Sequence, residues 1–341
     1  MAFINDIIIN ISRGTLGLQQ LVFTPLVMGS GPVASGVISI SSLTDLTDAG
    51  YLSTDEEYKM CAAMLAQSPS PSTIKVIRKA SGTAYDSALS TLITTDPDFY
   101  AVTIESREKA DLALAGTWAN SNKKFFFGGS DDITALTGRN ADREAYLIHD
   151  NSDIDYPECA WVGREIPKTP GSNTWKWKTL SGQNESNFNS TQLATIRSNN
   201  GQALQEQAGV IFTNEGVTTS GEYIDIIIGQ DWVEDQIRVG LLGLFLKNDK
   251  VPYDDSGIAQ IEGVVRDVLK RAGDNGIIAA AVSDADLEKS DDKEYIYQVT
   301  TVSRADSPVN ERANREYNGL DFVYTTAGAI HKVTVTGRIE V

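Results

Sequence analysis

Histidine and cysteine are scarce in this sequence, which has two of each. His149 follows an apolar run and His331 begins the last strand-like segment, so a structural role is the simpler interpretation of both. Neither forms a recognisable arrangement with a nucleophile, and there is no G-x-S-x-G motif. Cys61 and Cys159 have no C-x-x-C partner, which predicts two free thiols rather than a disulfide or a zinc site. The sequence thus offers no catalytic, cofactor-binding or metal-binding constellation.

Basic residues are also in short supply. The chain has 29 Lys and Arg against 46 Asp and Glu, a formal net charge of −17, which argues against direct nucleic-acid binding because phosphate recognition needs a basic surface. No apolar run approaches the roughly 20 residues of a membrane span, so we expect no membrane insertion. The opening "MAFINDIIINISRG" has an Asp in place of a basic region and no small-residue cleavage site, so we expect no signal peptide.

Two local motifs resemble binding loops but lack the residues that such loops require. The segment "GSGPVASG" at 29–36 has neither the Lys-Ser/Thr of a P-loop nor G-x-G-x-x-G spacing, so we predict a plain loop. The acidic run "SDADLEKSDDKE" at 283–294 lacks the glycine and the final glutamate of a calcium loop, which predicts a solvated loop. The stretch 175–178, Trp-Lys-Trp-Lys, fits two interpretations. It is either an interaction surface or a strand whose Trp face is packed and whose Lys face is exposed to solvent.

What the chain does have is alternating helix-like and strand-like segments over its first half. Apolar residues recur every three or four positions in three segments, which predicts helices at 53–66, 84–93 and 106–119. Between them, short β-branched and aromatic runs predict strands at 73–78, 99–104 and 123–129, after an apolar strand at 21–29 that Pro25 interrupts. This rhythm favours an open α/β sheet over about residues 26–165.

The second half has a different organisation. Residues 231–248 and 255–273 carry apolar stripes at helical spacing, the first with Asp231 as its N-cap. We predict strands at 174–180, 295–303 and 320–341, a helix within 190–207, and a β-hairpin or two adjacent strands over 209–229. The expected fold is an α/β domain joined to a separate α+β domain. The 341 residues are enough for roughly two domains.

Both ends of the chain have the pattern of half-buried strands without an obvious local partner. At the end, "HKVTVTGRIEV" alternates strictly, with an apolar face that only Gly337 interrupts and that consists of Val333, Val335, Ile339 and Val341. Near the start, "INDIIINIS" places Ile7, Ile9 and Ile11 on one face.

Side-chain burial does not explain how the terminal strand is held. Burying four aliphatic side chains contributes roughly 6–12 kcal/mol, whereas fixing about nine residues of backbone costs roughly 9–18 kcal/mol. The strand therefore needs ladder hydrogen bonds, each worth about 0.5–1.5 kcal/mol. An unpaired strand is also an aggregation-prone edge. We therefore predict that the strand has a partner, either within the chain or outside it.

Taken in order, several stretches resemble contractile tail sheath proteins of long-tailed phages and phage-derived particles, in particular a compact group of them. They are "NDIIINISRGT" with "LVFTPLVMG", "YKMCAAMLAQSPSPSTIKVIRK", "FYAVTIESREKADLALAGTWANSNKKFFF", "PGSNTWKWKTLSG", the long segment from "GEYIDIIIGQDW" to "KRAGDNGIIA", and the terminal "AGAIHKVTVTGRIEV". Many sheaths are longer because they carry additional outer domains.

The resemblance implies a structural subunit and not an enzyme, with no cofactor. It implies an inner lattice-forming α+β domain of residues 215–341, joined by an arm and first strand at 1–25, and an outer α/β domain of 26–214. It further implies that the N- and C-terminal arms add strands to neighbouring subunits. The intersubunit arm residues would be Ile7, Ile9, Ile11, Val333, Val335, Gly337, Ile339 and Val341, with a bulge or a close backbone approach at Gly337.

The implied function is that of a contractile tail sheath in the virion tail, assembled in the host cytoplasm. Subunits would form a helical homo-oligomer of stacked rings around a tail tube, with baseplate and tail terminator proteins as further partners. Contraction would drive the tube through the host envelope for genome ejection. Two other interpretations are an α/β enzyme or ligand-binding protein of unknown substrate, which the missing catalytic residues disfavour, and a tube protein, which the α/β alternation disfavours.

Overall fold

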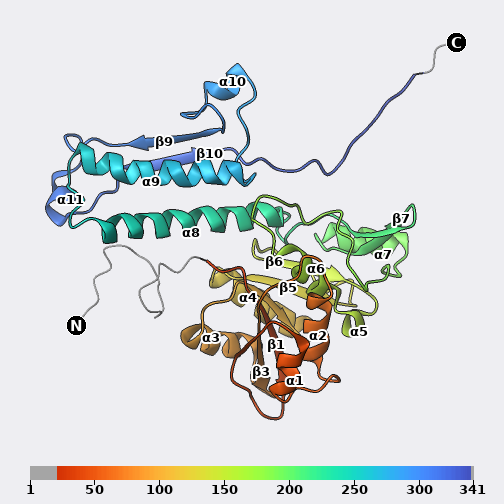
Figure 1. The fold of residues 1–341 in the computed structure, drawn as a ribbon. Coiled ribbons are helices and arrows are strands. Elements are labelled where there is room, and N and C mark those ends of the chain that lie inside the picture. The colour runs from red at the N-terminus through yellow and green to blue at the C-terminus, as the bar shows by residue number, and fades with distance from the viewer. Residues whose placement is uncertain (1–20, 339–341) are drawn as a thin grey trace.

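A computed structural model describes residues 21–338 of the chain, and a six-stranded sheet lies on one side of helix α8 (Ile224–Lys247) (Figure 1). The strand order is β2-β3-β1-β4-β5-β6, and all neighbours are parallel except β2, which is antiparallel to β3. The strands are β1 (Pro25–Gly31), β2 (Ile38–Ile40), β3 (Ile74–Ala80), β4 (Ala101–Ile104), β5 (Phe125–Ser130) and β6 (Glu144–Ile148). The open α/β sheet expected for this half of the chain is confirmed.

Two hydrophobic cores cover the two faces of the sheet. In β1, Val27 points into one core while Leu26 and Met28 point into the other, as the two-residue period of a strand requires. The helices around the sheet are α1 (Leu43–Asp48), α2 (Glu56–Leu65), α3 (Tyr85–Thr95), α4 (Lys109–Ser121), α5 (Ser152–Asp155) and α6 (Pro157–Glu165). Because helices pack on both faces, the strands β4, β5 and β6 are buried along their whole length.

Pro25 begins the first strand instead of interrupting it. Residues 21–24 form no strand, and β1 runs from Pro25 in the centre of the six-stranded sheet. Proline is compatible with this place because the first residue of a strand can do without a ladder N–H.

The segment between the sheet and the long helices departs from the sequence prediction. Residues 174–180, expected to form a strand, form none. The helix expected within 190–207 is α7 (Ser190–Ser198), and it ends because a short hairpin of β7 (Leu204–Gln207) and β8 (Val210–Thr213) follows. Asn189 caps α7 by accepting from the backbone N–H groups of Thr191 and Gln192.

Helix α8 (Ile224–Lys247) begins seven residues before the expected N-cap Asp231, and the strand predicted at its start is wrong. A run of isoleucines resembles a strand because β-branched residues favour sheets. However, the buried residues Ile224, Ile227 and Ile228 recur at helical spacing, and this face packs on the core of the sheet domain. Tertiary packing therefore decides the conformation here.

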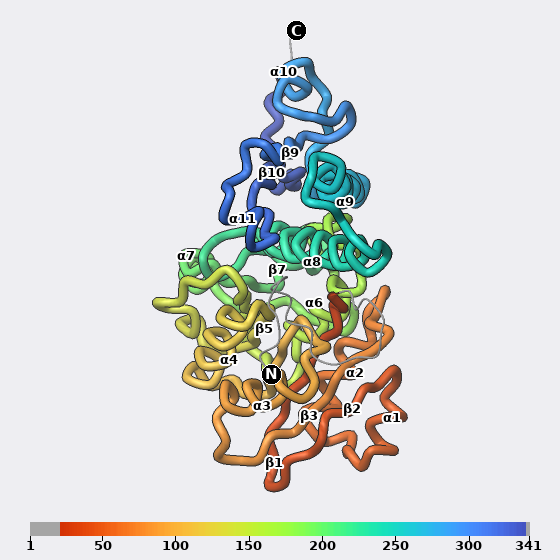
Figure 2. The backbone as a smooth tube through the Cα atoms, turned by 90° about the vertical axis from the view of Figure 1, so that its left-hand side faces the viewer, coloured from red at the N-terminus to blue at the C-terminus, as the bar shows by residue number. Residues whose placement is uncertain are grey.

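A further layer lies on the opposite side of α8 from the sheet (Figure 2). Its elements are α9 (Asp255–Asp274), α10 (Asp284–Leu287), β9 (Tyr297–Thr301), α11 (Val309–Asn314) and β10 (Leu320–Tyr324). α9 packs on α8, and the antiparallel pair β9–β10 covers α9. A third core of its own holds this layer together, with Val265, Val268, Leu269, Tyr297 and Val299 among its buried residues.

Candidate assembly surface

The β9–β10 pair has two outer edges, and the register identifies the backbone groups on each. Val302 N donates to Gly319 O and Thr325 N donates to Ile296 O. Hydrogen-bonded pairs alternate along an antiparallel ladder, so residues 298, 300, 321 and 323 face the partner strand. The N–H and C=O groups of Tyr297, Val299 and Thr301 therefore face outward from β9. Those of Leu320, Phe322 and Tyr324 face outward from β10.

The outer edge of β9 is covered at Tyr297 and Val299, mainly by the loop that precedes the strand. Tyr297 N donates to Ser290 Oγ at 3.2 Å and Tyr297 O accepts from Asp291 N at 2.9 Å. Val299 N donates to Asp291 Oδ2 at 2.9 Å, and Val299 O accepts from Arg266 Nη2 at 3.2 Å. Side chains thus occupy the positions that another strand would need, a common protection of edge strands. The acidic run 283–294, predicted to be a solvated loop, contains the short helix α10 and supplies Ser290 and Asp291 to this cover.

The outer edge of β10 is open. No residue between 21 and 338 hydrogen-bonds to the outward N–H or C=O groups of Leu320, Phe322 or Tyr324. The side chains of these three residues pack against the third core, so the strand is held on one face and free along its edge. An edge with unpaired donors and acceptors in register is a template for strand addition.

The C-terminal tail leaves the molecule immediately after this strand. Thr325 O accepts from Ala279 N at 2.8 Å and Ala327 N donates to Ile277 O at 2.9 Å, and the chain then runs outward in extended form (Figure 1). Val333 is 74% exposed and Val335 88% exposed, and neither lies in a strand. A Cβ built on Gly337 meets no atom within 4 Å. The arm-strand assignment for these three residues and the close approach at Gly337 stay predictions.

The remaining predicted arm residues fall outside the described part of the chain. These residues are Ile7, Ile9, Ile11, Ile339 and Val341.

His331 attaches the root of the tail to the body of the molecule. Its Nε2 lies 2.7 Å from Thr174 Oγ1, and its ring meets the ring of Tyr223 edge-on at a centroid distance of 4.9 Å. Burial lowers the pKa of His331, and the nearby Lys176 lowers it further. The neutral imidazole is therefore the form that this contact favours. The sequence offered no signal for the contact, because the partners are 157 residues apart.

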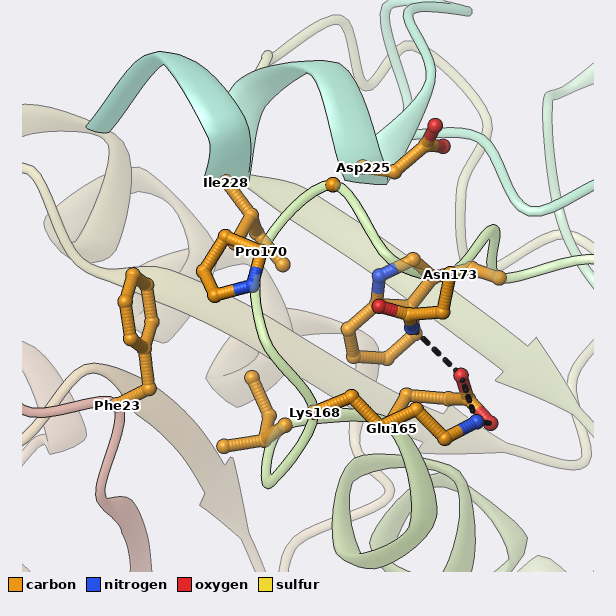
Figure 3. Close-up of a pocket in the computed structure, with 10 residues that line it drawn as sticks. Phe23, Glu165, Lys168, Pro170, Asn173, Asp225 and Ile228 are labelled. Carbon is orange, nitrogen blue, oxygen red and sulfur yellow. Dashed lines mark hydrogen bonds and ion pairs between the residues drawn. The ribbon is translucent and has the colours of Figure 1, made fainter. Parts of the chain in front are cut away.

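A cavity of about 220 Å³ lies beside this anchor, and its lining includes Thr174, Asp225, Ile226, Gly276 and Thr326. Burial raises the pKa of Asp225 to about 6, and its Oδ1 has no hydrogen-bond partner among the described residues. The adjoining hollow, in Figure 3, is nearly filled: Phe23, Pro170 and Ile228 line one side, and Glu165 pairs with Lys168 and Asn173 on the other. This second hollow is therefore packed.

The contact between the sheet domain and α8 is held by a buried charge cluster. Arg143 forms a bidentate ion pair with Asp231, whose side chain is 8% exposed, and Tyr100 donates its hydroxyl to Asp231 Oδ2 at 2.6 Å. Burial and the neighbouring Asp231 raise the pKa of Tyr100 well above its usual value. One turn further on, Asp235 Oδ2 accepts from Leu21 N at 2.7 Å. Helix α8 therefore contacts both the sheet domain and Leu21, the first described residue.

The C-terminal half of α8 is apolar on every side. It reads Val239-Gly-Leu-Leu-Gly-Leu-Phe-Leu, and Phe245 is 40% and Leu246 67% exposed. A helix that is hydrophobic all round is normally buried. Part of this surface therefore lacks its usual cover within the described chain.

The scarce catalytic residue types have structural roles. His149 is fully buried, with Nε2 3.2 Å from Asn184 O and Nδ1 accepting from Asn151 N. Cys61 and Cys159 are free and buried, as predicted, and burial raises the pKa of both thiols. No group of three or more His, Cys, Asp or Glu within residues 21–338 is arranged to hold a metal. No helix in this range is long and apolar enough to cross a membrane.

The Trp-Lys-Trp-Lys stretch does not form the strand that was one of its two sequence interpretations, and the other, an interaction surface, stays a prediction. Trp175 is buried against Phe127 and Trp161, whereas Trp177 is 48% exposed and packs on Phe212. Trp177 has a φ of +63°, so the segment does not have the alternation of a strand.

Comparisons with known proteins relate one part of the chain to a family and the whole chain to a fold. Residues 224–339 match the family "E217 tail sheath protein gp31-like, C-terminal domain", whose range covers α8, α9, β9, β10 and most of the tail. A search of curated proteins by sequence gives no match.

Two solved structures resemble the chain across most of its length. One is the PVC sheath of an extracellular contractile injection system in its contracted state, with a TM-score of 0.67 and 11% identity over 100% of this chain and 98% of that one. The other is the sheath tail protein Lin1278 from Listeria innocua, with a TM-score of 0.54 and 10% identity over 89% and 94%. Residues 224–339 therefore match a tail sheath family, and the chain as a whole has the fold of contractile sheath proteins.

Proposed function

We propose that the chain polymerises helically, as stacked rings, around a tail tube and contracts to drive the tube through the host envelope. The observation that carries this proposal is the pairing of two features within the family-matched region: a strand edge left open on β10 and a strand-patterned tail that leaves the molecule. One surface accepts a strand and the other supplies one, so copies can link head to tail without closing.

The proposed domain roles follow from the layers. Residues 215–341, with an arm at 1–25, form the inner unit that builds the lattice and faces the tube, and residues 26–214 form the outer unit. The separate core of the α8–α9–β9–β10 layer supports this division. The first strand expected within 1–25 does not support this division. The first strand of the described chain starts at Pro25 and belongs to the six-stranded sheet.

Strand addition from a second copy occurs at β10, because the loop 290–292 already occupies the β9 edge. The C-terminal arm, with Val333 and Val335, forms the strand that pairs with β10. The N-terminal arm, with Ile7, Ile9 and Ile11, forms the next strand beyond it. Because the arms keep copies linked, subunits can rotate and slide as largely rigid bodies during contraction while other contacts break and re-form. The energy for contraction is stored in the assembled lattice, so no nucleotide is needed.

The remaining partners follow from this role. The tail tube protein lies inside the lattice, a baseplate protein supplies the trigger, and a tail terminator ends the polymer. The subunits assemble in the host cytoplasm and remain in the virion tail.

Electron microscopy of the purified protein in negative stain tests the proposal. Long tubes or stacked rings are expected. If the protein forms only discrete small particles over a wide range of concentration and salt, and also in the presence of the tube protein, the polymer function is wrong.

The proposed edge makes a specific prediction about Leu320. Leu320→Pro removes an N–H that faces outward from β10, at the first residue of the strand, where proline is tolerated. Leu320→Ala shortens the same side chain but keeps the N–H. We expect the proline variant to polymerise at least several-fold less than the alanine variant, measured by sedimentation, with similar circular dichroism spectra. Equal polymerisation of the two variants would rule out this edge.

A further inference from the structure

The C-terminal tail could pair with the open β10 edge of its own subunit, so a contact is needed that keeps the tail away from that edge. The open edge of β10 ends at Tyr324, and the strand-patterned residues begin only a few positions later. A turn between them would let the tail fold back and pair with the strand it has just left. Such a hairpin forms within one chain and carries a smaller entropic cost than association with a second copy. A self-closed subunit could not accept a neighbour's arm.

The structure leaves little chain in which to make that turn. Residues 325–327 continue away from β10, since Thr325 O and Ala327 N are paired with Ala279 and Ile277. Gly328, with a φ of +60°, is the first residue after this pairing with a left-handed backbone conformation. Three residues later, His331 is attached to Thr174 and Tyr223. Three residues span at most about 11 Å, so the direction of the arm is set between Gly328 and His331.

We infer that His331 is a positioning residue that pins the root of the C-terminal arm to Thr174 and Tyr223, keeping the arm off the β10 edge of its own subunit and available to a second copy. The inference rests on the proposed strand addition, and it assigns a role to a contact far from the paired strands. The pin joins the tail to the loop before Trp175 and to the start of α8, so it fixes the arm relative to the body as well as to its own layer.

Burial of His331, together with the nearby lysines, makes the pin sensitive to acid. Lys176 and Lys178 lie on the segment after Thr174, Glu215 lies before α8, and Asp225 lies in its first turn. The pKa of His331 is lowered in the pinned state, so the released state binds more protons. The pin is therefore strongest above the ordinary histidine pKa of about 6.5 and weakens as pH falls below it.

Hydrogen exchange of the outward amides of β10 is the decisive measurement. In the dilute, unassembled wild-type subunit at pH 7.5, the amides of Leu320, Phe322 and Tyr324 are expected to exchange fast. In His331→Ala they are expected to become protected at least roughly tenfold, as the arm closes the edge of its own subunit. Removing residues 332–341 from this variant is expected to abolish the protection. Assembly of the full-length variant is expected to require a roughly tenfold higher protein concentration.

Thr174 supplies the matched controls. Thr174→Val removes the hydroxyl and keeps the shape, so it is expected to behave like His331→Ala, whereas Thr174→Ser keeps the hydroxyl and is expected to behave like wild type. Lowering the pH from 7.5 to 5.5 is expected to protect the wild-type amides and to leave His331→Ala unchanged, which separates His331 from Asp225.

The outcomes distinguish the pin from the proposed function. If His331→Ala assembles like wild type and its β10 amides exchange as fast, the pin is wrong even though strand addition stands. If removal of residues 332–341 from the wild-type chain leaves assembly intact, strand addition by this arm is wrong. In that case protection of β10 in His331→Ala would still support the pin, and its absence would overturn it.

Discussion

Removing residues 332–341 is expected to abolish polymerisation and to leave a folded, soluble monomer. The proposed arm supplies the ladder hydrogen bonds that link one copy to the next, whereas in the single chain Val333 and Val335 are exposed and support no core. Circular dichroism and the thermal midpoint of the monomer are expected to match those of the full chain. Electron microscopy and sedimentation measure the loss of tubes.

A single substitution provides a sharper version of this test. Val335→Pro removes one ladder N–H and prevents strand pairing on that side, so polymerisation is expected to fall at least tenfold. Val335→Thr keeps the N–H and the β-branched shape and is the matched control. Because Val335 is 88% exposed, neither change is expected to alter monomer stability by more than about 0.5 kcal/mol. Tubes of normal length that contract, formed by the proline variant, would contradict the model in which arms link the subunits.

Asp231→Ala is expected to destabilise the folded chain by about 3–5 kcal/mol. The change leaves the Arg143 guanidinium in a largely buried position without its carboxylate, and it removes the acceptor of the Tyr100 hydroxyl. This ion pair joins the sheet domain to α8, so the loss should appear as an earlier unfolding transition in urea. Because Arg143 and Tyr100 belong neither to β10 nor to residues 332–341, tubes formed at low temperature should retain their normal appearance.

Glu234→Ala is the matched control on the same helix. Glu234 pairs with Lys123, but both side chains are more than 60% exposed, so its loss is expected to cost less than about 1 kcal/mol. Each substitution removes one negative charge, so the difference in urea midpoint isolates the effect of burial. Equal destabilisation by the two variants would mean that the Asp231 cluster does not hold the domains together.

The six-stranded sheet and its helices were predictable because their signals are local. Buried parallel strands such as Phe125–Ser130 are apolar throughout, and the helices between them repeat their apolar residues at helical spacing. The resemblance to tail sheath proteins was likewise available from the order of short stretches. The start of α8 was not predictable, because three isoleucines that favour a strand in isolation are buried on one side of a helix in the fold.

The assembly surface, too, was predictable from the sequence only in part. Alternation along residues 332–341 was enough to predict a strand that needs a partner, because side-chain period is a property of neighbouring residues. Which edge receives a strand was not contained in that pattern. Ser290, Asp291 and Arg266 close β9, and β10 stays open, because of contacts between segments that meet only when the chain folds. The same holds for His331, whose position before the strand predicted nothing until folding brought Thr174, 157 residues away, within hydrogen-bond distance.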